Sequence, residues 1–337
     1  MKISIRITLI TFCCLLTYSI SKAQKITIVQ EGKPTSIRGL SVVNNKTAWV
    51  SGSKGYIAIT NDGGKTWDWQ QIKNYEQVDF RDIEAFSDKE AVIMSSGTPA
   101  LVLKTVDGGK TWQEKFNKAD SAYFLDAMDF IDRKHGYILG DPIKNKFLLM
   151  ETKDGGETWA EMQNTPEALP GEAAFAASGT CLRVNKDQGI VITSGGTVAR
   201  FLQLCNCERA QWQVKNLPLA QTAGSKGAFS ISDDLLVAVG GNYAKDRLTD
   251  SVICRFDKKS AQYQVLQVGT TGFQSCVERV WDRVYLSTGT SGSSISNELG
   301  KSWQKIDSTS FNVCRKAKHG KLILLAGDKG KIGTFKM

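Results

Sequence analysis

The feature that most constrains the fold of this chain is an eight-residue motif, repeated at nearly equal intervals. It reads TNDGGKTW at Thr60–Trp67, TVDGGKTW at Thr105–Trp112 and TKDGGETW at Thr152–Trp159, with a degenerate copy, SNELGKSW, at Ser296–Trp303. The aspartates of the first three copies are 45 and 47 residues apart. Repeats of about 40 to 50 residues are typical of β-propellers, in which each repeat forms one four-stranded blade. The sequence therefore predicts an all-β propeller.

The segments around the motif have the composition of short strands, because β-branched and apolar runs alternate with turn residues. In the first unit these runs are Arg38–Val43, Ala48–Ser51, Tyr56–Thr60 and Trp67–Ile72. The later units keep the same rhythm, with or without the motif. The fourth unit is expected to open with a strand over Ala173–Ser178. The seventh has only three runs, at Phe311–Arg315, Lys321–Ala326 and Lys331–Phe335.

A lone alternating run at Lys25–Gln30 precedes the first unit and is separated from it by Pro34. We expect it to be the missing fourth strand of the last blade, because closing the ring removes exposed strand edges. Six blades would leave the seventh unit unused, and eight would need strands that the sequence lacks. An open solenoid would leave two exposed edges. The sequence thus predicts a seven-bladed propeller closed by residues 25–30.

The first 23 residues have the pattern of a signal peptide. Lys2 and Arg6 precede the apolar run Ile7–Ile20, and Ser21-Lys22-Ala23 provides the small residues that signal peptidase requires. A membrane anchor is the alternative, but this run of 14 residues is shorter than the roughly 20 that span a bilayer. We expect cleavage between Ala23 and Gln24, a periplasmic or secreted protein, and one propeller domain over residues 24–337.

The charge and the cysteines limit the classes of partner and cofactor. The formal charge of +9 falls to +6 without the signal peptide, and basic residues are spread along the chain, which argues against nucleic-acid binding. Six cysteines remain: Cys181, Cys205, Cys207, Cys254, Cys276 and Cys314. Their spacing does not suit zinc, and His135 and His319 are the only histidines. Neither a haem motif nor a dinucleotide-binding motif in its strand–helix context occurs, so we expect no metal and no cofactor.

The repeated motif has a structural explanation that requires no ligand. Its Asp can accept hydrogen bonds from its own turn, its second Gly permits the turn, and its Trp can pack between blades. One carboxylate per turn is poor coordination for calcium. The predicted structural residues are Asp62, Gly64, Trp67, Asp107, Gly109, Trp112, Asp154, Gly156, Trp159 and Trp303.

These motifs resemble the Asp boxes of the bacterial-neuraminidase repeat, which occurs in sialidases, sortilin-type receptors and photosystem II assembly factors. The second unit, with Arg81-Asp82-Ile83 before the motif at 105–112, is most similar to the assembly-factor type. The resemblance implies a propeller and covers units one to three well. Because Asp boxes recur in proteins of unrelated activity, it says little about function.

A sialidase-like glycoside hydrolase is the alternative function. The resemblance would then imply three arginines around a substrate carboxylate, the first in an Arg-Ile-Pro motif. Arg38 is followed by Gly-Leu and Arg81 by Asp-Ile, and Arg200, Arg247, Arg279 and Arg283 do not form the expected series. We therefore favour a non-catalytic, monomeric protein that binds or assembles a protein or glycan partner. A partner with an acidic group would suit the positive net charge of the chain.

The blade pattern indicates where a partner would bind. Turns after the first and third strands of each blade lie on the Asp-box side, whereas loops after the second and fourth surround the opposite mouth of the channel, a common place for ligands. Polar residues expected at that mouth are Arg38, Arg81, Asp141, Lys144, Glu172, Arg200, Lys226, Asn242 and Tyr243. They are the predicted binding rim.

The cysteines of the fourth unit suggest a disulfide. Cys181 is expected beside the first hairpin of that unit, and Cys205 and Cys207 in the turn that replaces its Asp box. We expect Cys181 to pair with Cys205 or Cys207. Cys276 and Cys314 occupy matching positions in adjacent inner strands, where buried free thiols are as reasonable as a bridge.

Overall fold

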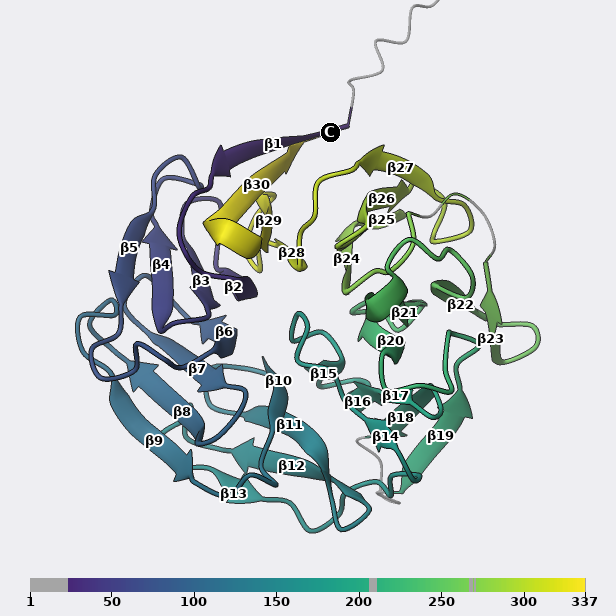
Figure 1. Cartoon of the computed structure of the whole chain (residues 1–337), viewed down its shortest axis with the longest axis horizontal. Coiled ribbons are helices and arrows are strands. Elements are labelled where there is room, and N and C mark those ends of the chain that lie inside the picture. Colours follow the sequence, from purple (N-terminus) through teal and green to yellow (C-terminus); the bar gives the residue numbers. More distant parts are fainter. Residues whose placement is uncertain (1–23, 206–210, 267–268, 270, 337) are drawn as a thin grey trace, which may run out of the picture.

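The computed structural model describes residues 24–205, 211–266, 269 and 271–336, and these residues form a ring of seven antiparallel sheets (Figure 1). The predicted signal peptide and Cys207 lie outside the described residues. The predicted fold class, a seven-bladed propeller of four-stranded blades, is confirmed. Among the described residues there is no helix with the length and apolar character needed to cross a bilayer.

The blades follow the chain in order. Blade one contains β2 (Ile37–Val42), β3 (Ala48–Gly52), β4 (Tyr56–Thr60) and β5 (Asp68–Gln71). Blade two contains β6 (Phe80–Ala85), β7 (Ala91–Ser95), β8 (Ala100–Thr105) and β9 (Gln113–Lys118). Blade three contains β10 (Leu125–Phe130), β11 (Gly136–Ile143), β12 (Lys146–Thr152) and β13 (Ala160–Glu161). Blade four contains β15 (Leu182–Asn185), β16 (Gly189–Thr193), β18 (Arg200–Leu204) and β19 (Trp212–Asn216).

The second half of the ring has the same architecture. Blade five contains β20 (Lys226–Ile231), β21 (Val237–Asn242), β22 (Ile253–Asp257) and β23 (Gln262–Val265). The short strands β14 (Glu172–Ala173) and β17 (Gly195–Gly196) extend its sheet. Blade six contains β24 (Cys276–Trp281), β25 (Val284–Gly289), β26 (Gly292–Ser296) and β27 (Gln304–Asp307). Blade seven contains β28 (Val313–Lys316), β29 (Ile323–Gly327) and β30 (Lys331–Lys336).

The ring closes as predicted. The first strand, β1 (Lys25–Gln30), pairs antiparallel with β30, from Lys25 opposite Lys336 to Gln30 opposite Ile332. Ile26 is buried in the core that joins the first and last blades. Chain-end pairing therefore supplies the outer strand of blade seven, which covers an edge of β30 that would otherwise be exposed.

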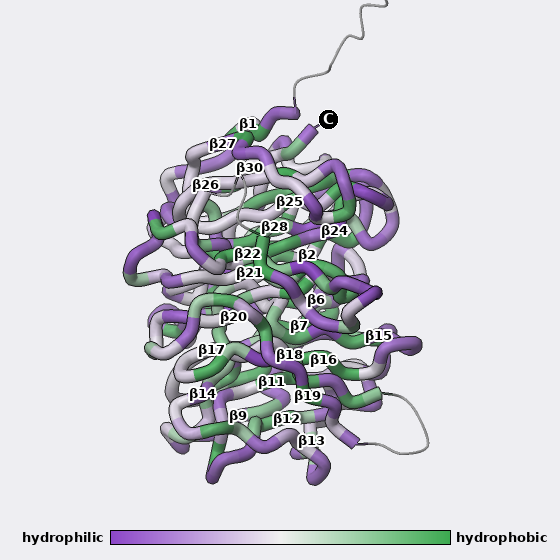
Figure 2. The backbone as a smooth tube through the Cα atoms, turned by 90° about the vertical axis from the view of Figure 1, so that its right-hand side faces the viewer, coloured by the Kyte–Doolittle hydropathy of each residue, from purple (hydrophilic) through white to green (hydrophobic). Residues whose placement is uncertain are grey.

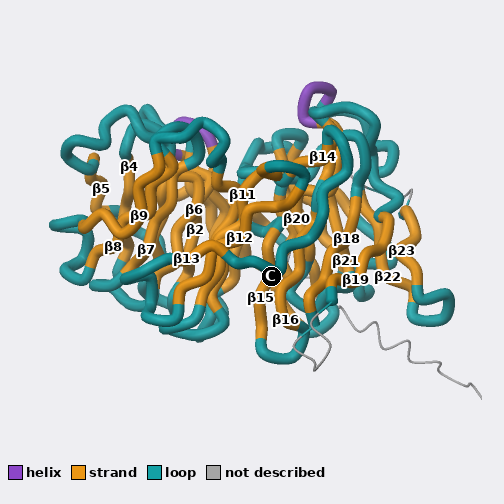
Figure 3. The backbone as a smooth tube through the Cα atoms, turned by 90° about the horizontal axis from the view of Figure 1, so that it is seen from below, coloured by secondary structure: helices purple, strands orange, loops and turns teal. Residues whose placement is uncertain are grey.

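Apolar layers between neighbouring blades form the core. Between blades one and two, for example, Trp49, Ile57 and Phe80 are fully buried in one cluster. The second strand of each blade is largely buried and the outermost strand is mostly exposed, as β7 and β9 illustrate. Apolar segments thus concentrate in the interior of the ring (Figure 2), and the loops gather on its two faces (Figure 3).

One predicted strand is wrong. The inner strand of blade four is β15, at Leu182–Asn185, and not Ala173–Ser178. Most of the predicted stretch belongs to an irregular segment, residues 174–181, that enters the centre of the ring beside β15 (Figure 1). Its small apolar residues resemble a strand in sequence. In the structure its polar groups bond to other blades across the channel instead of to a neighbouring strand.

Candidate functional site

Strand register defines the two faces of the ring. In blade one, Val42 pairs with Ala48 at the hairpin end of the inner strand, and Ile37 pairs with Gly52 at the other end. The Asp-box turn lies beside the hairpin, because the Gly63 N–H donates to the Lys46 carbonyl at 2.9 Å. We call this side the Asp-box face and the other side the opposite face.

The Asp boxes are self-contained hydrogen-bonded turns. Asp62 Oδ2 accepts from the Thr66 hydroxyl at 2.6 Å, and Asp62 Oδ1 accepts from the Lys65 and Thr66 N–H groups at 2.9 Å. The bond from the Thr66 hydroxyl is the main reason that the pKa of Asp62 falls to about 2. Asp107 has the same relation to Thr111, and its pKa also falls to about 2.

The third box obeys the same rule. Burial opposes the shift in Asp154, but hydrogen bonds from Thr158 outweigh it and the pKa again falls to about 2. Each box also contacts the preceding blade. Trp112 packs edge to face on Trp49 of blade one at 6.4 Å, and a Cβ at Gly109 would lie 3.0 Å from Ile57. The boxes therefore hold turn and blade together through hydrogen bonds and packing.

Arg38 and Arg81 lie close together on the opposite face, at the starts of adjacent inner strands. Arg81 pairs with Asp79 at 2.7 Å and lies over the Phe124 ring at 5.9 Å. Arg38, in contrast, has no carboxylate within 4 Å among the described residues. Burial lowers the pKa of Arg38 and the neighbouring charge of Arg81 lowers it further, whereas the charges of Asp79 and Asp328 act in the opposite direction.

Glu172 and Arg200 form a buried ion pair. Arg200 Nε donates to Glu172 Oε1 at 2.8 Å, and a second guanidinium nitrogen contacts Oε2. Glu172 also accepts from the Leu169 N–H at 2.8 Å and from the Ser194 hydroxyl. The Glu172 side chain has no exposed surface. This pair therefore anchors the loop before blade four. This structural role replaces the predicted role of Glu172 and Arg200 as ligand contacts.

The other predicted rim residues divide into structural and exposed ones. Asn242 is buried and caps the short 3-10 helix η1 (Tyr243–Lys245), accepting from the Ala244 N–H at 3.0 Å. Asp141 accepts from the Ala174 N–H at 3.1 Å, and burial raises its pKa. Lys144 is exposed in a left-handed turn, and Lys226 is partly exposed at the start of β20. Tyr243 is 53% exposed.

Sequence reasoning missed an aromatic cluster beside Tyr243. Phe175 stacks on Phe229 with ring centroids 3.8 Å apart, and Phe273 packs edge to face on Phe229 at 4.8 Å. Tyr243 contacts both Phe229 and Phe273 edge to face. The repeat predicts an ordinary strand for the segment that carries Phe175. It therefore does not predict that this segment lies in the channel.

Residues 174–181, which we call the channel segment, cross the channel and contact several blades. The Ser178 hydroxyl donates to the Ser275 carbonyl at 2.7 Å, and the Thr180 hydroxyl donates to Ser230 Oγ at 2.7 Å. Arg315 of blade seven donates to the Ser178 carbonyl at 2.6 Å. At Gly179, whose φ is +72°, a Cβ would lie 2.2 Å from Asp82 Oδ2 of blade two. Only glycine fits there, because both space and backbone conformation exclude a side chain.

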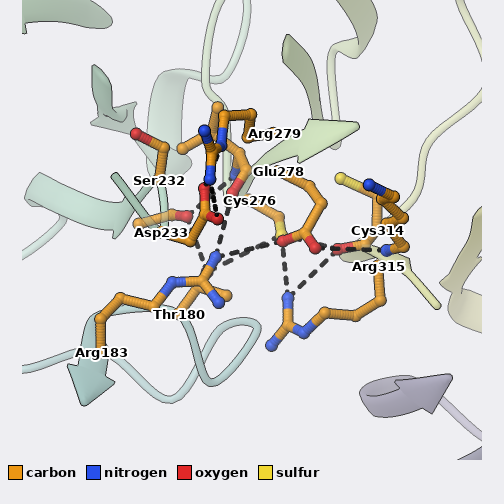
Figure 4. Close-up of polar contacts among 12 residues, drawn as sticks. Thr180, Arg183, Ser232, Asp233, Cys276, Glu278, Arg279, Cys314 and Arg315 are labelled. Carbon is orange, nitrogen blue, oxygen red and sulfur yellow. Dashed lines mark hydrogen bonds and ion pairs between the residues drawn. The ribbon is translucent and has the colours of Figure 1, made fainter. Parts of the chain in front are cut away.

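A cavity of about 920 Å³ lies above this segment, on the Asp-box face. All seven blades contribute to its wall, and Gly179 belongs to its lining. None of the nine predicted rim residues lines it. Deep in the wall, Glu278 pairs with Arg183 at 3.2 Å beside Arg315 and Cys276 (Figure 4). The sequence feature that could have indicated this cavity is the group of polar residues near the ends of the inner strands.

Several of these polar side chains join one blade to the next. The Met128 N–H donates to Asp82 Oδ2 at 2.8 Å, and the Val184 N–H donates to Asp129 Oδ2 at 2.8 Å. The Lys316 N–H likewise donates to Glu278 Oε1 at 3.2 Å. Burial raises the pKa of Asp82 to about 7 and that of Asp129 to about 6. Desolvation disfavours the charged carboxylates more than these bonds and nearby arginines favour them.

The predicted disulfide of Cys181 is wrong. Cys181 is a free, fully buried thiol whose Sγ donates to the Phe175 carbonyl at 3.4 Å. Cys205 is disulfide-bonded, but not to Cys181. The error follows from the misplaced strand, because Cys181 belongs to the channel segment and faces the ring interior. Cys276 and Cys314 are also free and buried.

Two kinds of site considered from the sequence, a metal centre and a sialidase-like arginine cluster, can be compared with the described residues. No group of three His, Cys, Asp or Glu residues within the described ranges is placed to hold a metal ion. The arginines considered for a sialidase site do not converge. Arg200 pairs with Glu172 near the opposite face, whereas Arg279 pairs with Asp233 in the wall of the cavity.

Comparisons with known proteins agree with this architecture. Residues 21–119 match the family model described as photosynthesis system II assembly factor YCF48. The structure of YCF48 bound to a D1 peptide has a TM-score of 0.67 at 16% identity, covering 93% of this chain and 97% of that one. YCF48 from Cyanidioschyzon merolae has a TM-score of 0.59 at 14% identity, with 92% and 98% covered.

A more distant likeness extends to other propellers. The WD40 domain of Neurospora crassa Pan2 has a TM-score of 0.59 at 13% identity, with 89% of both chains covered. No curated protein matches the chain in sequence. The predicted resemblance to Asp-box propellers of the photosystem II assembly-factor type is confirmed.

Proposed function

We propose that this YCF48-like propeller is a non-catalytic binding protein that captures a carboxylate-bearing segment of a partner protein on its opposite face. The observation that carries the proposal is Arg38. Its side chain is partly buried, lies beside a second arginine, and has no carboxylate within 4 Å among the described residues, and the carboxylates of Asp79 and Asp328 act on it only from farther away. A partly desolvated charge without a direct ion pair is stabilised by a hydrogen-bonded counter-ion. A carboxylate from a partner would supply it.

Arg81 supports the same site in a different way. Its Nε is held by Asp79 at 2.7 Å, so its position beside Arg38 is fixed. Arginine suits this task because its planar donors match a carboxylate in two parallel hydrogen bonds. Lys144, Lys226 and Tyr243 remain predicted contacts at the same mouth, where Tyr243 offers an aromatic surface to an apolar side chain.

The comparisons make a peptide the favoured class of partner. A propeller of the same fold has been solved with a peptide bound. The chain also carries the residue pattern of a signal peptide in its first 23 residues, so we propose that it meets this partner outside the cytoplasm. N-terminal sequencing of the protein exported from its native host should begin at Gln24. An N-terminus at Met1 would contradict export by this route.

Peptide display tests the binding function directly. The mature protein is screened against random hexapeptides with free carboxyl termini, and the best binder is titrated by fluorescence anisotropy. We expect Arg38→Ala to weaken binding about 10- to 100-fold, the loss of one or two charge-assisted hydrogen bonds. Arg38→Lys should keep part of the affinity. Lys301→Ala, a change in the degenerate Asp box, is the matched control and should bind like the wild type.

Two results would contradict the proposal. One is a hexapeptide whose affinity is unchanged by Arg38→Ala and by charge reversal of Arg38 and Arg81 together, but is lost on changing the Asp-box face. The other is selection of an acidic glycan from a glycan array with no hexapeptide bound, which would identify a carbohydrate partner instead.

A further inference from the structure

The cavity on the Asp-box face is separate from the predicted binding rim, and its charges are arranged in an informative way. Gly179 of the channel segment belongs to its lining, and the wall comes from all seven blades. Part of the charge is paired within the wall: Arg279 with Asp233 at 2.8 Å, Arg183 with Glu278 at 3.2 Å, and Lys318 with Glu84. Because these charges neutralise one another in pairs, the paired groups offer a ligand little net charge.

The remaining charged groups of three blades are segregated by sign. Arg315 and Lys316 come from blade seven, and neither has a carboxylate within 4 Å in the described part of the chain, although the charges of Asp82 and Glu278 act on Arg315 from farther away. Asp129, Asp132 and Asp187 come from blades three and four, and within the same residues none has a cationic side chain within 4 Å, although the charges of Arg183 and Lys186 act on Asp129 and Asp132 from farther away. Arg133 of blade three also lines the cavity and pairs with Glu90, which lies outside the lining. Blades three and four face blade seven across a seven-membered ring, as β10, β15 and β28 show in Figure 1.

This polarity holds at two depths. Arg315 and Asp129 belong to the deep wall, where Arg315 bonds to the Ser178 carbonyl and Asp129 to the Val184 N–H. Lys316 is partly exposed, and Asp132 and Asp187 are exposed at the rim. A ligand with a single charge would satisfy one wall and face like charge on the other. A ligand with a positive and a negative end satisfies both walls.

We propose that this cavity is a second binding site, which takes a short zwitterionic ligand, a free peptide of two or three residues. Its ammonium group lies toward blades three and four, and its carboxylate lies toward blade seven. The volume of about 920 Å³ is within the roughly 300 to 1,000 Å³ of small-ligand sites. It corresponds to a linear size of about 10 Å, which three extended residues span at roughly 3.5 Å each.

Calorimetry with three matched probes tests the site in the full mature protein. The probes are trialanine, N-acetyl-trialanine and trialanine amide. We expect trialanine to bind and each capped form to bind at least about 10-fold more weakly, the loss of one charge-assisted contact. Equal affinity for the three probes, or no binding of trialanine at millimolar concentration, would overturn the proposal.

Two variants assign the ends of the ligand. Lys316→Gln should weaken trialanine and abolish the preference over the amide, while the preference over the N-acetyl form remains. Asp187→Asn should do the reverse. Lys301→Gln and Asp88→Asn, on the same face but outside the cavity lining, are the charge-matched controls. Variants that leave both preferences intact would also overturn the assignment.

Arg38→Ala separates this proposal from the proposed function. The variant should bind trialanine like the wild type, because Arg38 is on the opposite face and outside the cavity. If hexapeptides do not bind at Arg38 but trialanine still binds, the proposed function would fail and the cavity site would remain supported. Loss of trialanine binding in Arg38→Ala would show that the two faces are not independent, and would overturn the separate site.

Discussion

The guanidinium of Arg315 donates a 2.6 Å hydrogen bond to the carbonyl of Ser178, and so ties blade seven to the channel segment. The same side chain donates to the Cys314 carbonyl at 3.1 Å and to Cys276 Sγ at 3.3 Å. A residue of an inner strand thus fixes the loop that crosses the channel. The lining of the cavity on the Asp-box face contains none of the predicted rim residues of the opposite face.

Replacing Arg315 should loosen the channel segment. Arg315→Leu removes the donors to two backbone carbonyls and leaves those carbonyls without this partner, so we expect a loss of about 2 to 4 kcal/mol in the free energy of unfolding. Urea unfolding measures the loss, and hydrogen exchange at Gly179 and Thr180 should become faster. Arg315→Lys should recover part of the stability. An unfolding free energy within about 0.5 kcal/mol of the wild type would contradict this role.

The buried pair of Glu172 and Arg200 should be costly to break from one side. Glu172→Gln leaves the Arg200 charge buried and unpaired, which typically costs about 3 to 5 kcal/mol. The double change Glu172→Leu with Arg200→Met should lose less than the single change. Asp233→Asn breaks the exposed pair with Arg279 and serves as the comparison, with an expected cost of at most about 1 kcal/mol. Equal losses in the two single variants, by urea unfolding, would exclude a special role for the buried pair.

The Asp boxes should stabilise the fold down to low pH. The pKa values of Asp62, Asp107 and Asp154 are lowered to about 2, so the folded state binds fewer protons than the unfolded state at these sites. Their contribution is present above the unfolded pKa near 4 and is lost as the pH falls toward 2. Thermal unfolding of the triple Asp→Asn variant should therefore depend less on pH between 4 and 2. A slope equal to that of the wild type would contradict the assignment.

Asp82 should act with the opposite sign. Burial raises its pKa to about 7, so between the unfolded pKa near 4 and pH 7 the folded state binds more protons than the unfolded state. Stability from this residue is present at low pH and falls as the pH rises through 7, by up to a few kcal/mol. Asp82→Asn should remove that fall.

Urea unfolding at pH 4.5 and 7.5 measures the effect, with Asp129 and the other buried carboxyls unchanged in both proteins. The wild type should lose more stability than Asp82→Asn on going to pH 7.5. Parallel changes in the two proteins would show that the Asp82 carboxyl titrates as it does in the unfolded chain.

Most of the fold could be predicted from the repeat. Three clear Asp boxes set the blade period, and a spare alternating run at Lys25–Gln30 implied closure, which the pairing of Ile26 with Phe335 bears out. These features are local: a turn that satisfies its own carboxylate, and strands with a two-residue period. Local patterns of this kind survive in the sequence because each depends only on near neighbours.

The candidate sites were less predictable because they depend on contacts between blades. The sequence placed Arg38 and Arg81 at one mouth, but it could not distinguish the unpaired Arg38 from Arg200, whose partner Glu172 lies 28 residues away. It also assigned residues 173–178 to a strand, although Ser178 bonds to a carbonyl 97 positions later. The disulfide expected for Cys181 was wrong for the same reason.

By itself, the sequence determined the blade period, the closing strand and the self-contained Asp-box turns, because their hydrogen bonds and packing recur within each unit. Only the tertiary structure decided that residues 174–181 cross the channel, that Glu172 and Arg200 neutralise one another, and that opposite charges line one cavity. Those facts depend on residues from different blades that meet at the axis of the ring, and no single repeat encodes such a meeting.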